Sequence, residues 1–337
     1  MAVTSIGSPV GPSKTTCGYC SPPGKRSAHR SSYHSAGLDA RLLSCEVYQK
    51  MIDRGWRRSG EYRTWCYKPD LRMSCCPQYT IRLDALTFKP SKSHRKLLNR
   101  YARCRLTLKS KVPHAFSLNT AVHAAETRFY DGEKSPKHQF ETSLEPSSYT
   151  PEKYNLYNKY QALIHSDDKS SPSGFTRFLV DSPLRTNPIP YPSAPPIHLP
   201  HNYGSYHQLY RLDGQLVALA VLDILPGCVS SVYFIYDKIW EEFSLGKLSA
   251  LREISLAREM QEAGAPQMAS LYMGFYIHSC QKMRYKGEYS PSYLADPETY
   301  EWFPLTTCVM GLEMYRYACF SHPEHSVTDL PSYLEGR

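Results

Sequence analysis

The feature that most constrains this fold is a proline-rich segment at residues 187–200, with the sequence NPIPYPSAPPIHLP. Proline lacks a backbone N–H and fixes φ, so this segment cannot form a central strand or the interior of a helix. We therefore expect the chain to divide around it. Residues 111–200 are rich in Ser, Pro and Asn, and they are predicted to form a linker or surface insertion with a short helix within residues 151–165.

Periodic patterns occur on both sides of this region. On the N-terminal side, they predict a helix at residues 46–54, a strand from residue 79 and a basic helix at residues 91–105. On the C-terminal side, residues 206–212 and 216–222 alternate like strands around Asp213-Gly214, a strong hairpin signal. A third strand at residues 228–236, a helix at 245–266 and a last strand at 271–278 follow.

Strands followed by a helix and a further strand predict an α/β (α+β) fold with a mixed sheet. The expected organisation is a disordered tail at 1–15, a Cys-rich and basic module at 16–110, the insertion at 111–200, a C-terminal region at 201–315 and a tail at 316–337.

Composition and the N-terminal sequence indicate the kind of partner and the cellular compartment. The 337 residues carry a formal net charge of +9, which favours a polyanionic partner. We expect no membrane association, because no run of about 20 apolar residues is present. The N-terminus has neither an apolar signal core nor an amphipathic Arg-rich presequence, so the cytosol or nucleus is predicted. Thiols stay reduced there, and eleven cysteines then indicate metal, cluster or redox chemistry before disulfides.

Four of these cysteines stand out by spacing. Cys17 and Cys20 form a C-x2-C pair, and Cys75 and Cys76 are adjacent just before Pro77. Neighbouring side chains on a strand point apart, so this second pair must lie in a turn if both thiols serve one site. Zinc and iron–sulfur clusters both take four cysteine thiolates. The alternative is that all four are incidental free thiols, because an adjacent pair fits no common zinc-finger spacing.

A basic segment follows the cysteine pairs. No acidic residue lies between Asp84 and Glu126. The cations predicted to bind RNA phosphates from the helix at 91–105 are Lys92, Arg95, Lys96 and Arg100. The alternative is an ordinary solvated helix face. Upstream, Arg57 and Arg58 follow a tryptophan, and arginine suits bidentate recognition of a carboxylate or phosphate.

Common nucleotide-dependent chemistry is not indicated. The sequence contains no P-loop, no G-x-G-x-x-G and no G-x-S-x-G motif. We therefore expect no nucleotide cofactor. Acyl transfer from acyl-CoA is disfavoured as well, because the Gly-rich pyrophosphate loop of acetyltransferases is not evident.

Several long motifs resemble the arginyl-tRNA–protein transferases of the eukaryotic, fungal type. The matching stretches are CGYC, DRGWRRSG, CCPQYTIRL, FKPSKSHRKLL, LPGCVSSVYFIYD, LGKLSALREISLAREM and YMGFYIHSCQKMRYKGEYSPS. They cover roughly residues 17–105 and 206–308. The resemblance implies two acetyltransferase-like (GNAT-like) halves and a zinc or iron–sulfur site at Cys17, Cys20, Cys75 and Cys76.

The resemblance also implies a reaction. Arginine would pass from Arg-tRNA to the α-amine of proteins that begin with Asp, Glu or oxidised Cys, marking them for ubiquitin-dependent degradation in the N-degron pathway. Tyr276 and His278 are the expected catalytic residues, with a buried tyrosine and a structural histidine as the alternative. The residues expected to bind the acceptor or the arginyl group are Arg57, Arg58, Asp237, Glu253 and Arg284. For Glu253 the alternative is a solvated helix residue.

The loop KMRYKG adds Lys282 and Lys286 as expected contacts to tRNA, with a solvated basic loop as the alternative. A second function class stays open: a catalytically inactive, metal-stabilised binder of tRNA or acidic N-termini. The sequence leaves the oligomeric state open.

Overall fold

The computed structural model describes residues 4–20, 26, 33–59, 65–105, 117–124, 126, 138–167 and 169–329. The chain divides into two compact units, each a mixture of helices and strands, which confirms the α/β class. Unit 1 comprises Met1–Phe88, Pro183–Arg185 and Tyr272–Arg337, and unit 2 comprises Lys89–Ser182 and Thr186–Leu271. Among the described residues, no helix is both long enough and apolar enough to cross a bilayer.

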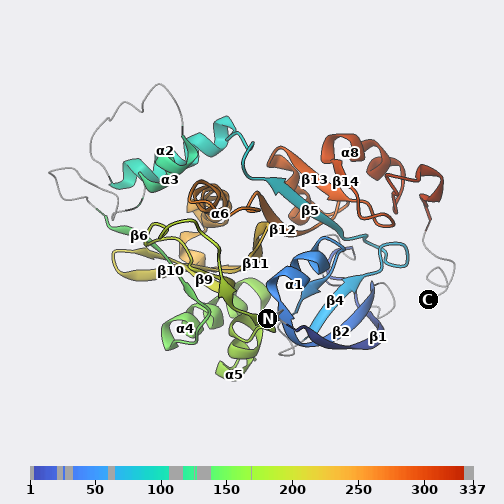
Figure 1. The fold of residues 1–337 in the computed structure, drawn as a ribbon, viewed down its shortest axis with the longest axis horizontal. Helices are drawn as coiled ribbons and strands as arrows, with labels where there is room; N and C mark the ends of the chain where they lie inside the picture. Colours follow the sequence, from blue (N-terminus) through green and yellow to red (C-terminus); the bar gives the residue numbers. More distant parts are fainter. Residues whose placement is uncertain are drawn as a thin grey trace. The chain divides into compact units, whose positions relative to one another are not determined.

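The N-terminal part of unit 1 is an antiparallel sheet with one helix (Figure 1). Its strands, in spatial order, are β1 (Ile6–Thr15), β2 (Tyr33–Ser44), β4 (Trp65–Pro69) and β3 (Arg57–Arg58), and β7 (Leu184–Arg185) pairs with β2 in parallel. Helix α1 (Cys45–Ile52) begins where the Ser44 hydroxyl accepts a hydrogen bond from the backbone N–H of Val47. A serine cap of this kind satisfies one of the otherwise unpaired N–H groups of the first turn. The helix lies where the sequence predicts it.

Strand β1 differs from the sequence expectation of a disordered tail. Residues 6–15 pair along β2, from Ile6 opposite Leu42 to Thr15 opposite Tyr33. Nearly every residue of β1 is exposed, so the strand buries no apolar face and shows no alternating pattern. Proline is tolerated at the edge of a sheet, where its missing N–H faces solvent, and Pro9 and Pro12 occupy this edge strand.

Unit 1 also contains a second set of strands and two helices, which come from the C-terminal part of the chain apart from the strand at residues 79–84. The strands, in spatial order, are β14 (Trp302–Pro304), β13 (Ser292–Ala295), β5 (Tyr79–Asp84) and β12 (Ser270–Tyr276, of which 272–276 belong to this unit). The helices are α7 (Gln281–Arg284) and α8 (Leu305–Met314). The predicted strand after Pro77 is confirmed as β5, with Tyr79, Ile81 and Leu83 buried.

Unit 2 is organised around antiparallel strands. Their spatial order is β11 (Cys228–Tyr236), β10 (Gln215–Leu225), β9 (Asn202–Leu212) and β6 (Phe140–Pro146), with β8 (Asn187–Pro188) paired to β9. Asp213 and Gly214 both have positive φ, 50° and 81°, as the tight primed turns of hairpins require, so the predicted hairpin is confirmed. Strand β10 is buried on both faces from residue 216 onward, which explains its nearly continuous apolar sequence.

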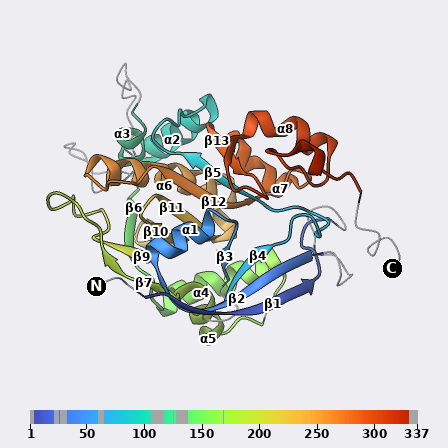
Figure 2. The ribbon, with the colours of Figure 1, turned by 45° about the vertical axis from the view of Figure 1, so that its right-hand side comes forward.

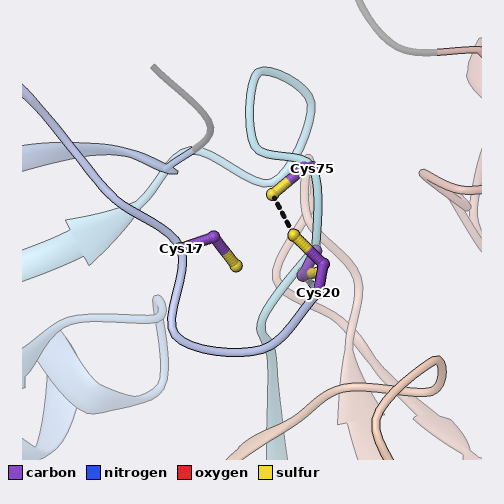
Figure 3. A group of neighbouring side chains, drawn as sticks. Cys17, Cys20 and Cys75 are labelled. Atoms are coloured by element: carbon purple, nitrogen blue, oxygen red, sulfur yellow. Dashed lines mark hydrogen bonds between the residues drawn. The ribbon is translucent and has the colours of Figure 1, made fainter. Parts of the chain in front are cut away.

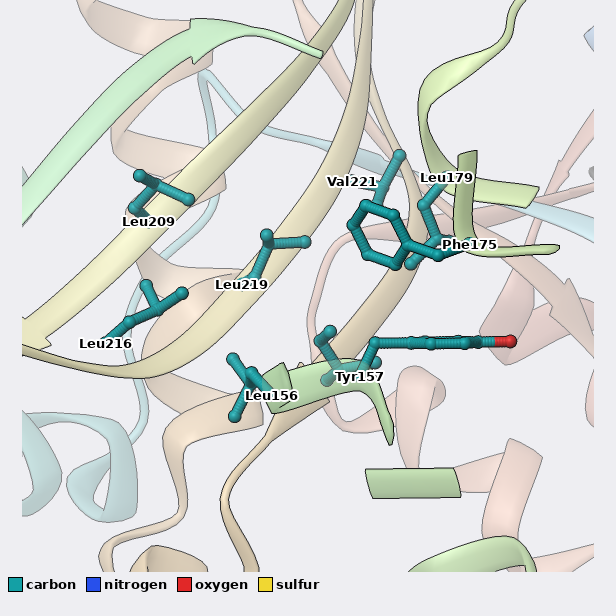
Figure 4. Close-up of a cluster of buried hydrophobic side chains, with 9 residues drawn as sticks. Leu156, Tyr157, Phe175, Leu179, Leu209, Leu216, Leu219 and Val221 are labelled. Carbon is teal, nitrogen blue, oxygen red and sulfur yellow. The ribbon is translucent and has the colours of Figure 1, made fainter. Parts of the chain in front are cut away.

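Helices cover both faces of these strands (Figures 1 and 2). On one face lie α2 (Lys92–Arg105), α3 (Leu118–His123) and α6 (Leu245–Glu262), and on the other lie α4 (Pro151–Tyr160) and α5 (Pro172–Phe175). Leu219 and Val221 of β10 pack with Tyr157 of α4 and Phe175 of α5 in a buried apolar cluster, which we call the unit 2 core (Figure 4). The predicted insertion at 111–200 thus supplies β6, α4 and α5, including the short helix expected there.

Candidate functional site

The four cysteines singled out by their spacing converge in unit 1. Cys17 and Cys20 follow β1, while Cys75 and Cys76 lie in a bend that ends just before β5. The bend is held by Ser74, whose hydroxyl accepts from the backbone N–H of His34 at 3.0 Å and donates to the His34 carbonyl at 3.2 Å. The adjacent pair therefore lies in a turn, as the sequence predicts.

The sulfur atoms form a compact donor set. All four Sγ atoms lie within 4.8 Å of one another, and those of Cys20 and Cys75 are 3.5 Å apart. Figure 3 shows the sulfurs of Cys17, Cys20 and Cys75 turned toward one another. Four thiolates bound to one zinc ion at about 2.3 Å stand roughly 3.8 Å apart in a tetrahedron. These residues therefore fit a single tetrahedral ion with little movement.

The thiols also compete for protons. Hydrogen bonds from Cys75 and Cys76 lower the pKa of the Cys17 thiol well below its ordinary value. The same contact with Cys17 raises the pKa of Cys75 to about 12 and raises that of Cys76 as well. Cys17 is therefore the thiol that ionises first. Because zinc and iron bind thiolates rather than thiols, a bound cation would favour ionisation of the other three.

The cysteine cluster packs against the segment that follows β12. Cys17 and Cys76 share a buried apolar cluster with Ile277 and Cys280, on either side of His278. Of the predicted catalytic residues, His278 lies in this segment and Tyr276 is the last residue of β12. The cysteine site thus packs directly against the residues on both sides of His278.

Tyr276 and His278 form a hydrogen-bonded pair. The Tyr276 hydroxyl lies 3.0 Å from Nδ1 of His278. Burial lowers the pKa of His278, as does the positive charge of Arg284, so the imidazole is neutral at pH 7. Burial likewise raises the pKa of Tyr276. When Nδ1–H donates to the tyrosine oxygen, Nε2 is left with a lone pair that can accept a proton. Tyr276 itself is buried, and the proposed catalytic role of the pair stays a prediction.

Arg57 and Lys286 are two further cations that contact β12 in unit 1. The guanidinium of Arg57 donates to the backbone carbonyls of Ile52, Trp56 and Gly274 at 2.7–3.2 Å and stacks 4.9 Å from the centre of the Phe275 ring. The Gly274 backbone has a φ of 69°, which a residue with a side chain rarely adopts. Arg57 therefore holds an unusual backbone conformation just before Tyr276.

Lys286 differs from the exposed loop cation that the sequence predicts. Its side chain is buried, and Nζ donates to the carbonyl of Phe275 at 2.5 Å. Burial, aided by the charge of Arg57, lowers the pKa of Lys286 to about 7.

Lys282 and Arg284 are exposed, as expected of residues that contact a substrate. Arg58 is buried like Arg57, and its backbone N–H donates to the Tyr48 hydroxyl at 2.9 Å.

The remaining predicted site residues lie in unit 2. Asp237 is buried, accepts from the backbone N–H of Ile239 and pairs with Lys159 at 3.4 Å. Glu253 is buried within α6 and accepts a 2.6 Å hydrogen bond from Ser249, so its interpretation as a solvated residue is wrong. Burial raises the pKa of Glu253 to about 7.

Helix α2 presents its cations to solvent. Lys92, Arg95, Lys96 and Arg100 are all exposed, whereas Leu97, Leu98 and Tyr101 are buried. Arg100 also donates to the carbonyl of Glu242 at 3.3 Å. The predicted amphipathic helix is confirmed. Its phosphate contacts stay a prediction.

Sequence reasoning missed three features of the site. It gave no role to Cys280, which packs under the cysteine cluster, and it did not predict the burial of Lys286. It also missed a cluster of His123, His198 and Glu259 in unit 2. A signal for Cys280 was available, since it lies only two residues after a predicted catalytic histidine.

Two family models match: the N terminus of arginine-tRNA-protein transferase at residues 15–96 and its C terminus at residues 152–296. Arginyl-tRNA–protein transferase 1 of Drosophila melanogaster is 32% identical over 93% of this chain and 85% of its own length. The Saccharomyces cerevisiae enzyme of the same name is 34% identical over 75% of this chain and 49% of its own length.

More distant similarities extend to bacteria. The aspartate/glutamate leucyltransferase of Pseudomonas fluorescens SBW25 is 26% identical over 74% of this chain and 80% of its own length. Among solved structures, L-PGS from Bacillus licheniformis gives a TM-score of 0.29 at 11% identity, covering 59% of this chain and 45% of that one.

Proposed function

This chain belongs to the family of arginine-tRNA-protein transferases, and we propose that it transfers arginine from Arg-tRNA to the α-amine of proteins whose first residue is Asp, Glu or oxidised Cys. The observation that carries this proposal is the presence of both family segments in one chain, at residues 15–96 and 152–296. The acidic acceptor is supported by the bacterial relatives, whose name specifies aspartate and glutamate.

The reaction needs little from the protein besides positioning and proton transfer. The ester that joins arginine to the ribose is already activated, so no nucleotide hydrolysis is required. The attacking α-amine has a pKa of about 8 and is partly neutral at physiological pH. Its nitrogen forms a bond to the carbonyl carbon, the ester C–O bond breaks, and a proton must move from nitrogen to the ribose oxygen.

We assign this proton transfer to His278. Its lowered pKa keeps the imidazole neutral and able to accept the proton of the attacking amine, and its bond to Tyr276 fixes the ring. Arg284 is exposed and its positive charge lowers the pKa of His278. We assign to it the binding of the carboxylate of the acceptor's first residue. Arg57 then has a positioning role, because its guanidinium is occupied by backbone carbonyls.

The roles of Asp237 and Glu253 toward the donor arginyl group stay predictions. Only an ionised carboxylate pairs with a guanidinium. The pKa of Glu253 is about 7, so near neutral pH its carboxyl is protonated in a fraction of the molecules. Approach of the arginyl group would favour the ionised form of this carboxyl.

For the cysteine site we propose a single zinc ion held by Cys17, Cys20, Cys75 and Cys76. In an iron–sulfur cluster at least two cysteines bind different irons and stand apart, whereas these four sulfurs all lie within 4.8 Å. When bound, the ion would supply a structural link between the loop after β1 and the bend before β5. Elemental analysis of purified protein distinguishes zinc from iron, and iron as the main metal would contradict this assignment.

Other parts of the prediction rest on the family resemblance. The GNAT-like fold is supported by the antiparallel strands β9, β10 and β11 followed by helix α6 in unit 2. The exposed cations of α2, together with Lys282, are suited to the tRNA phosphates. Degradation of the modified protein and a location in the cytosol or nucleus remain part of the proposal.

The decisive experiment measures transfer directly. The purified chain is incubated with radiolabelled Arg-tRNA and a peptide that begins with Asp, and we expect label in the peptide. His278→Gln should lower kcat by about 10²- to 10⁴-fold, the usual contribution of a positioned proton acceptor, with little change in tRNA binding. His322→Gln, at an exposed histidine of the same unit, is the matched control. Tight tRNA binding without label would instead support the inactive binder.

A further inference from the structure

A second group of metal-ligating side chains lies in unit 2 and has no part in the proposed reaction. It consists of His123 at the end of α3, His198 in the proline-rich segment and Glu259 in α6. Each side chain is at most 16% exposed. Three segments that are distant in the sequence therefore meet at one point inside this unit.

The two imidazoles are aimed at a single carboxylate oxygen. Nε2 of His123 lies 3.0 Å from Oε2 of Glu259, and Nε2 of His198 lies 2.6 Å from the same oxygen. The two ring centres are 5.4 Å apart with planes at 76°. All three potential ligand atoms lie within 4.8 Å of one another. Ligands about 2.0–2.2 Å from a tetrahedral zinc ion stand roughly 3.3–3.6 Å apart, so the side chains need to separate only slightly.

The surrounding residues orient this group as the outer contacts of a metal site do. The other oxygen of Glu259, Oε1, accepts from Ser255 at 2.6 Å and from Arg252 at 3.2 Å. The far nitrogen of His123, Nδ1, faces Oε1 of Glu126 at 3.7 Å. A carboxylate near the far nitrogen of a ligating histidine recurs in zinc sites. At 3.7 Å this contact is longer than a hydrogen bond, so the effect of Glu126 on His123 is electrostatic.

Charge in this region is compatible with a cation. Glu126 and Glu259 both pair with the one guanidinium of Arg252. Arg252 contacts Glu259 through Oε1, on the opposite side of the carboxylate from Oε2, where the imidazoles converge. A cation placed among the three ligand atoms would therefore be next to a carboxylate oxygen that Arg252 does not occupy.

We propose that His123, His198 and Glu259 bind one divalent transition-metal ion, zinc by preference, separate from the cysteine site. Two imidazoles and a carboxylate are a set that zinc accepts, with water in the remaining position. The ion would attach the proline-rich segment to α3 and α6. The proposal concerns binding of the ion in unit 2 and does not depend on the transfer reaction.

Metal stoichiometry tests this directly. The full chain and its variants are saturated with Zn²⁺, dialysed and analysed for bound metal. His198→Gln keeps an amide that can donate to Glu259 but removes the imidazole ligand, and it should lose about one equivalent of zinc relative to the unmodified chain. His138→Gln, at an exposed histidine of unit 2 paired with Asp213, should lose none.

A second variant adds a spectroscopic signal rather than removing one. His198→Cys places a thiolate at the site, and after loading with Co²⁺ it should show an additional thiolate-to-metal charge-transfer band beyond that of the cysteine site. The proposal is overturned if His198→Gln retains the same zinc content as the unmodified chain. It is also overturned if folded His198→Cys has the cobalt spectrum of the unmodified chain.

Discussion

The two units bury their polar groups in different surroundings. In unit 1, the buried Lys286 donates to the backbone carbonyl of Phe275 and is subject to the positive charge of Arg57. The four clustered thiols lie in the same unit. In unit 2, the buried Glu253 lies on α6. The apolar core of this unit packs on β9 and β10. Burial moves both pKa values to about 7, one downward and one upward.

The two units depend mainly on different forces. Residues around the cysteine site are fixed by hydrogen bonds and, as we propose, by metal ligation, and the apolar cluster there is small. The unit 2 core contains four leucines from α4, β9 and β10, and phenylalanine and tyrosine rings pack with them. Apolar burial is worth about 25 cal/mol per Å², so such a core needs no ion to hold it. We therefore expect metal loss to affect unit 1 first.

The largest effect is expected from the double change Cys20→Ser with Cys76→Ser. Metal bound to four cysteines contributes about 10–16 kcal/mol of apparent free energy in zinc-finger peptides, so its loss should unfold the region around the site. Metal content should fall, and hydrogen exchange should accelerate in β4 and β5 while β10 stays protected. Equal acceleration in β10 would show that the two units do not differ in this way.

Cys45→Ser is the matched control for this change. Cys45 is a buried thiol of unit 1 that donates to the carbonyl of Arg185, and a serine hydroxyl can make the same bond. This variant should retain its metal content and its exchange pattern.

The next largest effect should come from the unit 2 core. Leu219 is fully buried, so Leu219→Ala should lower the free energy of unfolding by about 2–5 kcal/mol through lost burial and the cavity left behind. Urea denaturation measures the loss, while metal content should not change. Ile239→Ala, at a side chain that is 67% exposed, should shift stability by no more than about 0.5 kcal/mol. A loss of metal from the cysteine site in Leu219→Ala would contradict the separation of the two forces.

Local pattern explains which elements the sequence could predict. Helices α1, α2 and α6 and strands β9 to β11 have apolar residues at regular spacing and clear turn or cap residues, and they lie where expected. Strand β1 could not be predicted, because an exposed edge strand has no apolar alternation. The same holds for residues 140–160, whose place in unit 2 depends on pairing β6 with β9 across 60–72 residues.

The sequence predicts those parts of the candidate site whose residues form recognisable short motifs. The spacing of the cysteine pairs identified all four thiols, and the structure brings them together. His198 and Glu259 are 61 positions apart and show no shared pattern, so only the tertiary structure joins them. The buried state of Lys286 is equally a consequence of packing, since its neighbours Lys282 and Arg284 are exposed.

The buried lysine of unit 1 predicts a stability that rises with pH. An unfolded lysine has a pKa of about 10.4, and burial lowers that of Lys286 to about 7. Between these values the unfolded state binds more protons, so folding becomes more favourable as pH rises from 7 to 10. Lys286→Met removes this dependence, and chemical denaturation at pH 7 and pH 9.5 should show a rise of about 1–4 kcal/mol in the unmodified chain relative to the variant. Lys282→Met, at an exposed lysine, should follow the unmodified chain, and a slope common to all three would contradict the burial of Lys286.

The buried glutamate of unit 2 predicts the opposite slope. An unfolded glutamate has a pKa of about 4.3, and burial raises that of Glu253 to about 7. The folded state then binds more protons between these values, so stability is lost as pH rises through this range and is not regained above it. Glu253→Gln resembles the protonated carboxyl at every pH. It should match the unmodified chain at pH 5 within about 1 kcal/mol and exceed it by about 1–3 kcal/mol at pH 8. Glu242→Gln, at an exposed position, should show no such gain. Parallel curves for Glu253→Gln and the unmodified chain would mean that Glu253 is ionised in the fold, which would make it the better candidate for pairing with the arginyl group.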